Sequence, residues 1–214
     1  MGEILKLLKR YDEALAAYVD SFHYELDNVN KVDIHRERGA LLALLKRHDE
    51  AIEAYLDQAE ACGRAWLDAR EPYEQIVQLT PTSVYSWKRK ARACEYLQLY
   101  NEAVMAYQQA LKQVNDISEK ADIYLSIGSL LKLLKRYDEA VRIYYQGVLL
   151  CPNDYRFYRE KAEIFKDFKR YRQALAAYEQ AIALIPHNMN FSMEKIRSEI
   201  ETLKRLISSD NGMV

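Results

Sequence analysis

The sequence predicts an all-α protein built from stacked antiparallel helix pairs, and three observations support this. Residues 5–14 read LKLLKRYDEA, and the same ten letters return at residues 131–140. Only six glycines and four prolines interrupt the 214 residues, which favours long helices over many turns. Apolar residues recur at helical spacing, as in Ile127, Leu130 and Leu134. Repeated units of this kind bury their core between neighbouring copies rather than around one centre.

Each copy contains an aromatic or histidine anchor, followed in most copies by an acidic residue. The anchors are Tyr11, His48, Tyr100, Tyr137 and Tyr171. Seven residues after the anchors lie Tyr18, Tyr55, Tyr107, Tyr144 and Tyr178. Nine residues before them lie Gly2, Gly39, Ala91, Gly128 and Ala162. A small residue in the first helix of a pair lets the two backbones approach closely, so we expect the tyrosine to pack into the space that this leaves. For His48, we favour this packing role over a role as a ligand.

Charged residues flank the anchors in a fixed order. Basic pairs such as Lys46-Arg47 end the first helix, where the helix dipole favours cations. Acidic pairs such as Asp49-Glu50 open the second helix, where capping groups and anions are favoured. A repeated charged binding motif is the alternative. We prefer turn chemistry because the copies that have these charges place them at the same helix ends.

This pattern resembles the tetratricopeptide repeat, a helix-turn-helix of about 34 residues. The stretch Trp87…Ala91…Tyr100…Ala103…Tyr107…Ala110 fits that family's pattern, and so does Tyr124…Gly128…Tyr137…Ala140…Tyr144…Pro152. The resemblance implies a right-handed α-solenoid of about five repeats over residues 1–187. A C-terminal capping helix over 188–208 and a flexible tail over 209–214 are expected to follow.

The interval between the second and third anchors departs from the regular repeat. The anchors His48 and Tyr100 are farther apart than any other neighbouring pair, by about the length of one helix. The sequence therefore predicts one extra or irregular helix near residues 62–81. Gly63 could break the chain there, or Pro72 could end a longer helix that starts near Asp49; the sequence leaves both alternatives open.

The two ends of the array each have a specific expectation. One apolar stripe should hold the capping helix against the last repeat; its residues are Phe191, Ile196, Ile200, Leu203 and Ile207. At the other end, the first helix begins midway through the repeat pattern. This leaves apolar side chains without their usual cover, namely Ile4, Leu5, Leu7 and Leu8. Such an edge could pair with a second copy as a homodimer.

Composition and motifs exclude several classes of function. A formal charge of -1 gives no global attraction to nucleic acid or to an anionic membrane. Cys62, Cys94 and Cys151 are too far apart for a metal or redox motif, so we expect buried reduced thiols and a cytoplasmic protein. The sequence has no phosphate-binding glycine loop, H-E-x-x-H or G-x-S-x-G, so we expect no enzyme, no cofactor and no metal.

The resemblance implies that the first helices line a groove for a peptide or a helix of a partner. Mapped onto this chain, the partner-binding candidates are Tyr85, Lys88, Arg89, Arg92, Tyr96, Leu125, Ser126, Ser129, Lys132, Arg156 and Arg159. The third copy places three cations within five residues, between Tyr85 and Tyr96, which suggests an acidic partner. An exposed charged helix face without a partner is the alternative.

The sequence thus predicts a non-enzymatic scaffold or adaptor that binds another protein. A self-associating assembly module is a second hypothesis. Binding of RNA by a helical repeat is a third, which the near-neutral charge and the lack of a repeated base-reading pair disfavour.

Overall fold

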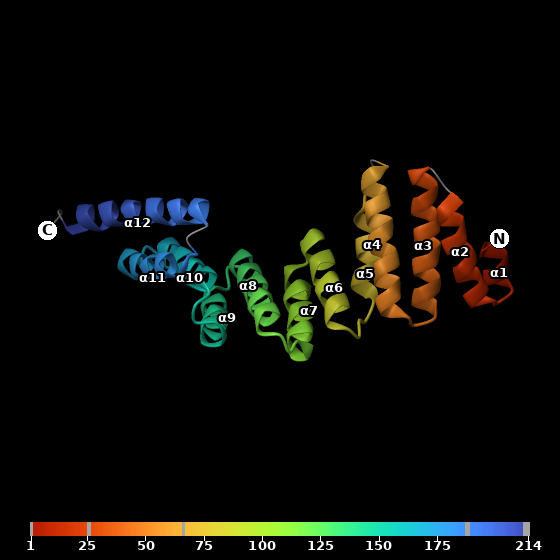
Figure 1. Ribbon diagram of the computed structural model, residues 1–214, viewed down its shortest axis with the longest axis horizontal. Helices are drawn as coiled ribbons and strands as arrows, with labels where there is room; N and C mark the ends of the chain where they lie inside the picture. The colour runs from red at the N-terminus through yellow and green to blue at the C-terminus, as the bar shows by residue number, and fades with distance from the viewer. Residues whose placement is uncertain (1, 25–26, 66, 187–188, 212–214) are drawn as a thin grey trace. The chain divides into compact units, whose positions relative to one another are not determined.

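The computed structural model describes residues 2–24, 27–65, 67–186 and 189–211, and the regular secondary structure of these residues is helical (Figure 1). The helices are α1 (Gly2–Leu7), α2 (Tyr11–Tyr24), α3 (Asn28–Leu44), α4 (His48–Arg64), α5 (Arg70–Gln78), α6 (Val84–Tyr96), α7 (Tyr100–Gln113), α8 (Ile117–Leu133), α9 (Tyr137–Leu150), α10 (Tyr155–Asp167), α11 (Tyr171–Leu184) and α12 (Asn190–Asn211). The contacts divide the chain into two compact units, Met1–Gln113 and Val114–Val214, where the sequence predicts one array.

Both units consist of helix pairs in which neighbours along the chain pack together. In the first unit the pairs are α1 with α2, α3 with α4 and α6 with α7; in the second they are α8 with α9 and α10 with α11. Every predicted anchor is the first residue of a second helix, from Tyr11 of α2 to Tyr171 of α11. The predicted all-α fold of stacked helix pairs is therefore confirmed.

The turn inside each pair uses the same backbone conformation. Five residues have φ between 57° and 60°, and each lies two positions before an anchor: Lys9, Lys46, Gln98, Lys135 and Lys169. In the α3–α4 turn the Arg47 amide then donates to the carbonyl of Leu42 at 2.9 Å, which satisfies one of the last carbonyls of α3. Arg47 also holds Glu50 through two hydrogen bonds of 2.7 and 2.6 Å. These charges act within the turn, as predicted.

The predicted contact between the small residue and the tyrosine determines how closely the helices of a pair approach. A Cβ atom built on Gly39 would lie 2.7 Å from Cε1 of Tyr55, and one on Gly128 would lie 2.2 Å from Cε1 of Tyr144. Tyr55 and Tyr144 are both buried. Glycine at these positions lets the ring of the second helix lie directly on the backbone of the first.

The extra helix is α5, and it fills the interval between α4 and α6. Helix α4 ends at Arg64, just after Gly63, so a longer helix reaching Pro72 does not form. Pro72 lies instead in the first turn of α5, where a missing amide hydrogen costs little. Residue 66, within the predicted range 62–81, lies outside the described residues.

Two groups of contacts hold α5 against α4. Ile76 and Leu79 enter the apolar cluster that contains Ile52 of α4. After α5, Nδ1 of His48 lies 2.9 Å from the carbonyl oxygen of Thr80. Asp49 accepts hydrogen bonds from the Thr82 amide at 2.9 Å and hydroxyl at 2.7 Å. His48, the anchor that differs from the tyrosines, thus also bonds to the segment that the other repeats lack.

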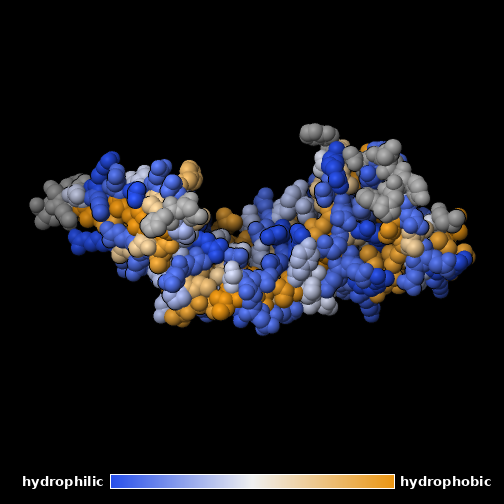
Figure 2. Space-filling view, viewed as in Figure 1, coloured by the Kyte–Doolittle hydropathy of each residue, from blue (hydrophilic) through white to orange (hydrophobic). Residues whose placement is uncertain are grey.

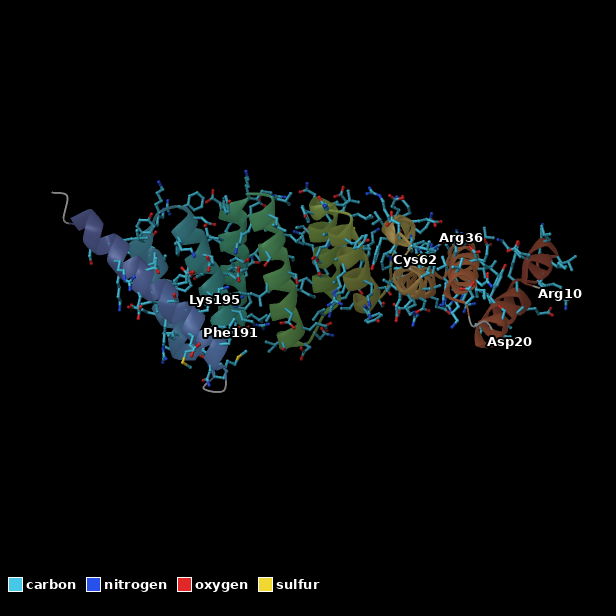
Figure 3. All side chains as sticks on the ribbon, turned by 90° about the horizontal axis from the view of Figure 1, so that it is seen from above. Arg10, Asp20, Arg36, Cys62, Phe191 and Lys195 are labelled. Carbon is cyan, nitrogen blue, oxygen red and sulfur yellow. The ribbon has the colours of Figure 1, made fainter. Side chains whose placement is uncertain are left out.

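Helix α12 covers the last pair of the second unit. Ile196, Ile200 and Leu203 are buried in a cluster with residues of α10 and α11. Phe191, which the sequence places in the same stripe, is 82% exposed, so that prediction is wrong. Phe191 lies in the first turn of α12, on the surface near Lys195 (Figure 3). The helix continues to Asn211, and residues 212–214 of the expected tail lie outside the described residues.

The cysteines are free thiols. Cys62 and Cys94 are buried and Cys151 is half-buried. Burial raises the pKa of Cys94 to about 11, because a thiolate is poorly solvated there. None of the described helices is long and apolar enough to cross a membrane. Among the described residues, no group of three or more His, Cys, Asp or Glu side chains is arranged to hold a metal ion.

Candidate partner-binding surface

Helix α6 contributes the predicted residues of the first unit. Tyr85 and Tyr96 are about half exposed, at 51% and 53%, and Arg92 is exposed. Lys88 and Arg89 are partly buried. A serine sets the start of the helix: the side chain of Ser83 accepts from the Ser86 amide at 3.2 Å and caps α6.

Several of these side chains are held in place by their neighbours. The Arg89 guanidinium donates to the Tyr85 hydroxyl and lies over the Tyr85 ring, 4.6 Å from its centroid. The Tyr96 ring lies 4.2 Å from the ring of Tyr73 on α5, measured between centroids. Both exposed tyrosines are therefore ordered before any partner arrives. This reduces the entropy that binding would cost.

The cation cluster on α6 is not neutralised by the helix itself. The helix contains Lys88, Arg89, Lys90 and Arg92 against one acid, Glu95. Nζ of Lys90 donates to the Leu79 carbonyl at 2.6 Å, and burial lowers the pKa of Lys90. Arg92 makes no hydrogen bond or ion pair with any described residue. Its positive charge is available on the surface.

In the second unit the predicted cations are paired with acids of the same unit. Nζ of Lys132 on α8 lies 2.6 Å from Oε2 of Glu160 on α10. Arg159 lies 2.8 Å from Oε1 of the same carboxylate. Arg156 lies 2.8 Å from Asp122 and 2.7 Å from Asp154. These three cations are therefore already engaged.

The environment of Glu160 shows that this pairing is strong. The side chain is only 14% exposed, and burial alone would raise its pKa. Hydrogen bonds from Lys132 and Arg159 outweigh burial and hold the pKa of Glu160 below its ordinary value. Binding an acidic partner at Lys132 would first require breaking this pair.

The remaining candidates of the second unit lie on α8. Leu125 and Ser126 are half-buried and Ser129 is exposed. The Ser126 hydroxyl donates to the Asp122 carbonyl one turn earlier, at 3.1 Å. These three side chains carry no charge. The neighbouring cation Lys132 is paired with Glu160 and contributes to the packing of the second unit.

A series of lysine–glutamate pairs between first helices was missed by the sequence analysis. Lys6 of α1 lies 2.8 Å from Glu37 of α3, and Lys132 pairs with Glu160 in the same register. The lysine lies five residues before its anchor and the glutamate eleven before the next. Aligning the copies would have revealed this spacing. The residue of α6 that lies eleven before its anchor is Arg89 rather than a glutamate, so this series does not include α6.

Lys166 of α10 continues the series at the C-terminal end. It lies 3.0 Å from Glu199 of α12 and 2.9 Å from Glu163. Helix α12 thus provides the glutamate that the first helix of a following repeat would provide. It also covers the apolar cluster of the last pair.

Comparison with known protein families agrees with this architecture. A tetratricopeptide repeat model matches residues 5–66 and 88–155, and a second tetratricopeptide repeat model matches residues 155–188. The chain belongs to the tetratricopeptide repeat family. The interval between the first two matches contains α5, the helix that interrupts the alternation of first and second helices in this tetratricopeptide repeat protein. No curated protein matches the chain.

Solved structures share the fold at low sequence identity. The type III secretion chaperone SycD from Yersinia enterocolitica, crystallised with a peptide of the translocator YopD, is 19% identical, with a TM-score of 0.51; the match covers 56% of this chain and 92% of SycD. PcrH from Pseudomonas aeruginosa is 17% identical, with a TM-score of 0.51 and coverages of 56% and 91%. MamA is 17% identical, with a TM-score of 0.48 and coverages of 86% and 94%.

Proposed function

We propose that this tetratricopeptide repeat protein is a non-enzymatic adaptor that binds an acidic segment of a partner protein along α6. The observation that carries the proposal is the exposed Arg92 between two ordered tyrosines, on a helix with four cations and one acid. The paired cations of α8 and α10 support the same conclusion, because they leave α6 as the favoured acceptor of negative charge. Peptide binding by SycD, which has the same fold, is consistent with a peptide-like ligand.

Magnitudes indicate which contacts such binding needs. An exposed ion pair contributes about 0.2–1 kcal/mol, whereas micromolar affinity requires about 8 kcal/mol. Charge on α6 therefore directs and orients the partner, and burial of Tyr85 and Tyr96 must supply much of the remaining free energy. The expected partner segment combines acidic with apolar or aromatic residues.

The test is a quantitative pull-down from the native cell with mass spectrometry. The variant Lys88→Glu, Arg89→Glu, Arg92→Glu should lose the specific partners of the wild-type chain. A control variant reverses three exposed cations elsewhere: Lys112→Glu, Arg142→Glu, Arg197→Glu. It has the same net charge and should retain them. Equal recovery of all partners by both variants would remove α6 as the binding surface.

Exposed apolar residues in α1 and directly after it favour a second candidate function, self-association. Ile4 and Leu8 are each 60% exposed and Leu7 is 81% exposed. Hydrophobic residues are visible on the surface at this end of the first unit (Figure 2). Sedimentation of the wild-type chain and of Ile4→Lys, Leu8→Lys over a range of concentrations tests this. Self-association predicts a concentration-dependent dimer that the double variant abolishes, and a wild-type monomer throughout would reject it.

A further inference from the structure

A hollow between the second helices α2 and α4 differs in character from the α6 surface. It has a volume of 360 Å³, within the range of small-ligand sites. Its lining comes from α2, α3 and α4 and consists of Leu15, Ala16, Val19, Arg38, Leu42, Arg47, Glu50 and Glu53. The lining combines aliphatic side chains with charged ones: α2 contributes only aliphatic residues, α3 one of each kind, and α4 with the preceding Arg47 only charged residues.

Three of the four charged residues in the lining are paired. Arg47 binds Glu50 through two hydrogen bonds. Arg38 lies 2.6 Å from Asp57. Glu53 is different: its Oε1 is buried and has no hydrogen-bond partner among the described residues. Burial raises the pKa of Glu53, and the positive charge of Arg89 on α6 opposes this rise only in part. Arg89 donates a hydrogen bond to Tyr85, and its own buried Nε has no hydrogen-bond partner among the described residues.

The fold does not need an acid at this position. A buried acceptor without a donor costs about 1–3 kcal/mol. Glu53 lies five residues after its anchor, His48. The residues at this position in the other copies are Ala16, Met105, Arg142 and Ala176. Packing between second helices is thus compatible with small, apolar or basic residues, and only the second copy has a carboxylate there.

A second hollow provides an internal comparison. It lies in the second unit, has a volume of 240 Å³ and is lined by Tyr137, Asp138, Val141, Ile164, Phe165, Phe168 and Arg170. Val141, Phe165 and Arg170 stand in the register of Leu15, Leu42 and Arg47 of the first hollow. The helix that follows this hollow has Ala176 where α4 has Glu53. The shared positions show that the repeat contributes to both hollows, whereas a lining carboxylate five residues after the anchor is found in the first hollow and not in the second.

We propose that the hollow between α2 and α4 binds an arginine side chain of a protein partner. The guanidinium would donate to the Glu53 carboxylate, and its aliphatic stem would lie along Leu15, Val19 and Leu42. A guanidinium suits this site because it is weakly hydrated and forms directed hydrogen bonds to a carboxylate. This surface is separate from α6 and has the opposite charge preference, so the protein would engage basic as well as acidic segments.

The test uses two capped pentapeptides that differ in one group. The first has a central arginine flanked by leucines, and the second has citrulline, the neutral isostere, in place of arginine. Each is titrated into the isotopically labelled full chain, up to about 10 mM, and followed by backbone amide shifts. The arginine peptide should shift amides of α2 and α4 around Val19 and Glu53. Citrulline should weaken binding by about tenfold, as expected for loss of a charge-assisted hydrogen bond.

Two variants assign the effect to Glu53. Glu53→Gln keeps the shape and removes the charge, so the arginine peptide should bind it no better than the citrulline peptide. Glu60→Gln makes the same charge change on an exposed residue of the same helix and should leave binding unchanged. Absence of shifts in α2 and α4, equal affinity for the two peptides, or full binding to Glu53→Gln would each overturn the proposal. Glu53→Gln should fold at least as stably as the wild type, so lost binding cannot be attributed to misfolding.

Discussion

Replacing Gly128 by alanine should destabilise the second unit. The new Cβ would lie 2.2 Å from Cε1 and 2.5 Å from Cζ of Tyr144, whose side chain is fully buried and cannot move aside. Overpacking of a core costs about 1–3 kcal/mol, and so close a contact belongs at the upper end. Alanine recovers about 1 kcal/mol of helix propensity. The net loss should therefore be about 1–2 kcal/mol.

Urea denaturation followed by circular dichroism measures this loss, and hydrogen exchange in α8 and α9 locates it. The exchange measurement is needed because repeat arrays often unfold unit by unit. Gly63→Ala is the matched control, since its Cβ would meet no atom within 4 Å. That variant should gain about 0.5–1 kcal/mol, because alanine restricts the unfolded chain and favours helix.

A double-mutant cycle isolates the contact with the tyrosine ring. In a Tyr144→Leu background the obstructing ring is absent, so Gly128→Ala should become neutral or stabilising. The reasoning is refuted if Gly128→Ala is as stable as the wild type, or if it destabilises equally with and without Tyr144.

Three further predictions follow from the turns and the ion pairs. Lys135→Gly should stabilise the protein by about 0.5–1 kcal/mol in urea denaturation, because φ at this position is 58°. Lys112→Gly, in the last turn of α7, should instead destabilise it, by less than the roughly 1 kcal/mol of a helix interior. Glu160→Gln should lower the free energy of unfolding by about 1.5–3 kcal/mol at pH 7. Because the folded-state pKa of Glu160 is lowered, its stabilising contribution is present at neutral pH and is lost as the pH falls through that pKa. The free energies of unfolding of wild type and variant should therefore converge in acid. As part of the same test, Lys132→Met should cost more than Arg159→Met, because Lys132 contributes more than Arg159 to holding the Glu160 carboxylate; equal or reversed costs would contradict this. Asp49→Ala should destabilise by about 1 kcal/mol and speed hydrogen exchange in the loop after α5; unchanged exchange would contradict the proposed role of that carboxylate.

The sequence predicted the helix pairs because the signals that define them are local. The start of each second helix follows from the anchor and its neighbouring charges, within one turn of the chain. The Gly39–Tyr55 contact was predictable for the same reason, since both residues lie in one hairpin and recur in register. The cation cluster on α6 could likewise be recognised from adjacent residues.

Residues far apart in the chain meet only when the copies stack, and the tertiary structure alone decided those relationships. It showed that Lys132 is bound by Glu160, which removes a predicted partner-binding cation from the free surface. It placed Phe191 in solvent, although that residue shares helical spacing with buried neighbours, because the packed face of α12 begins one turn later. It also left Oε1 of Glu53 without a hydrogen-bond donor among the described residues, in a hollow lined by residues of three helices. The periodicity of one helix states which side is apolar, but only the neighbouring helix determines how much of that side is covered and which charges are neutralised.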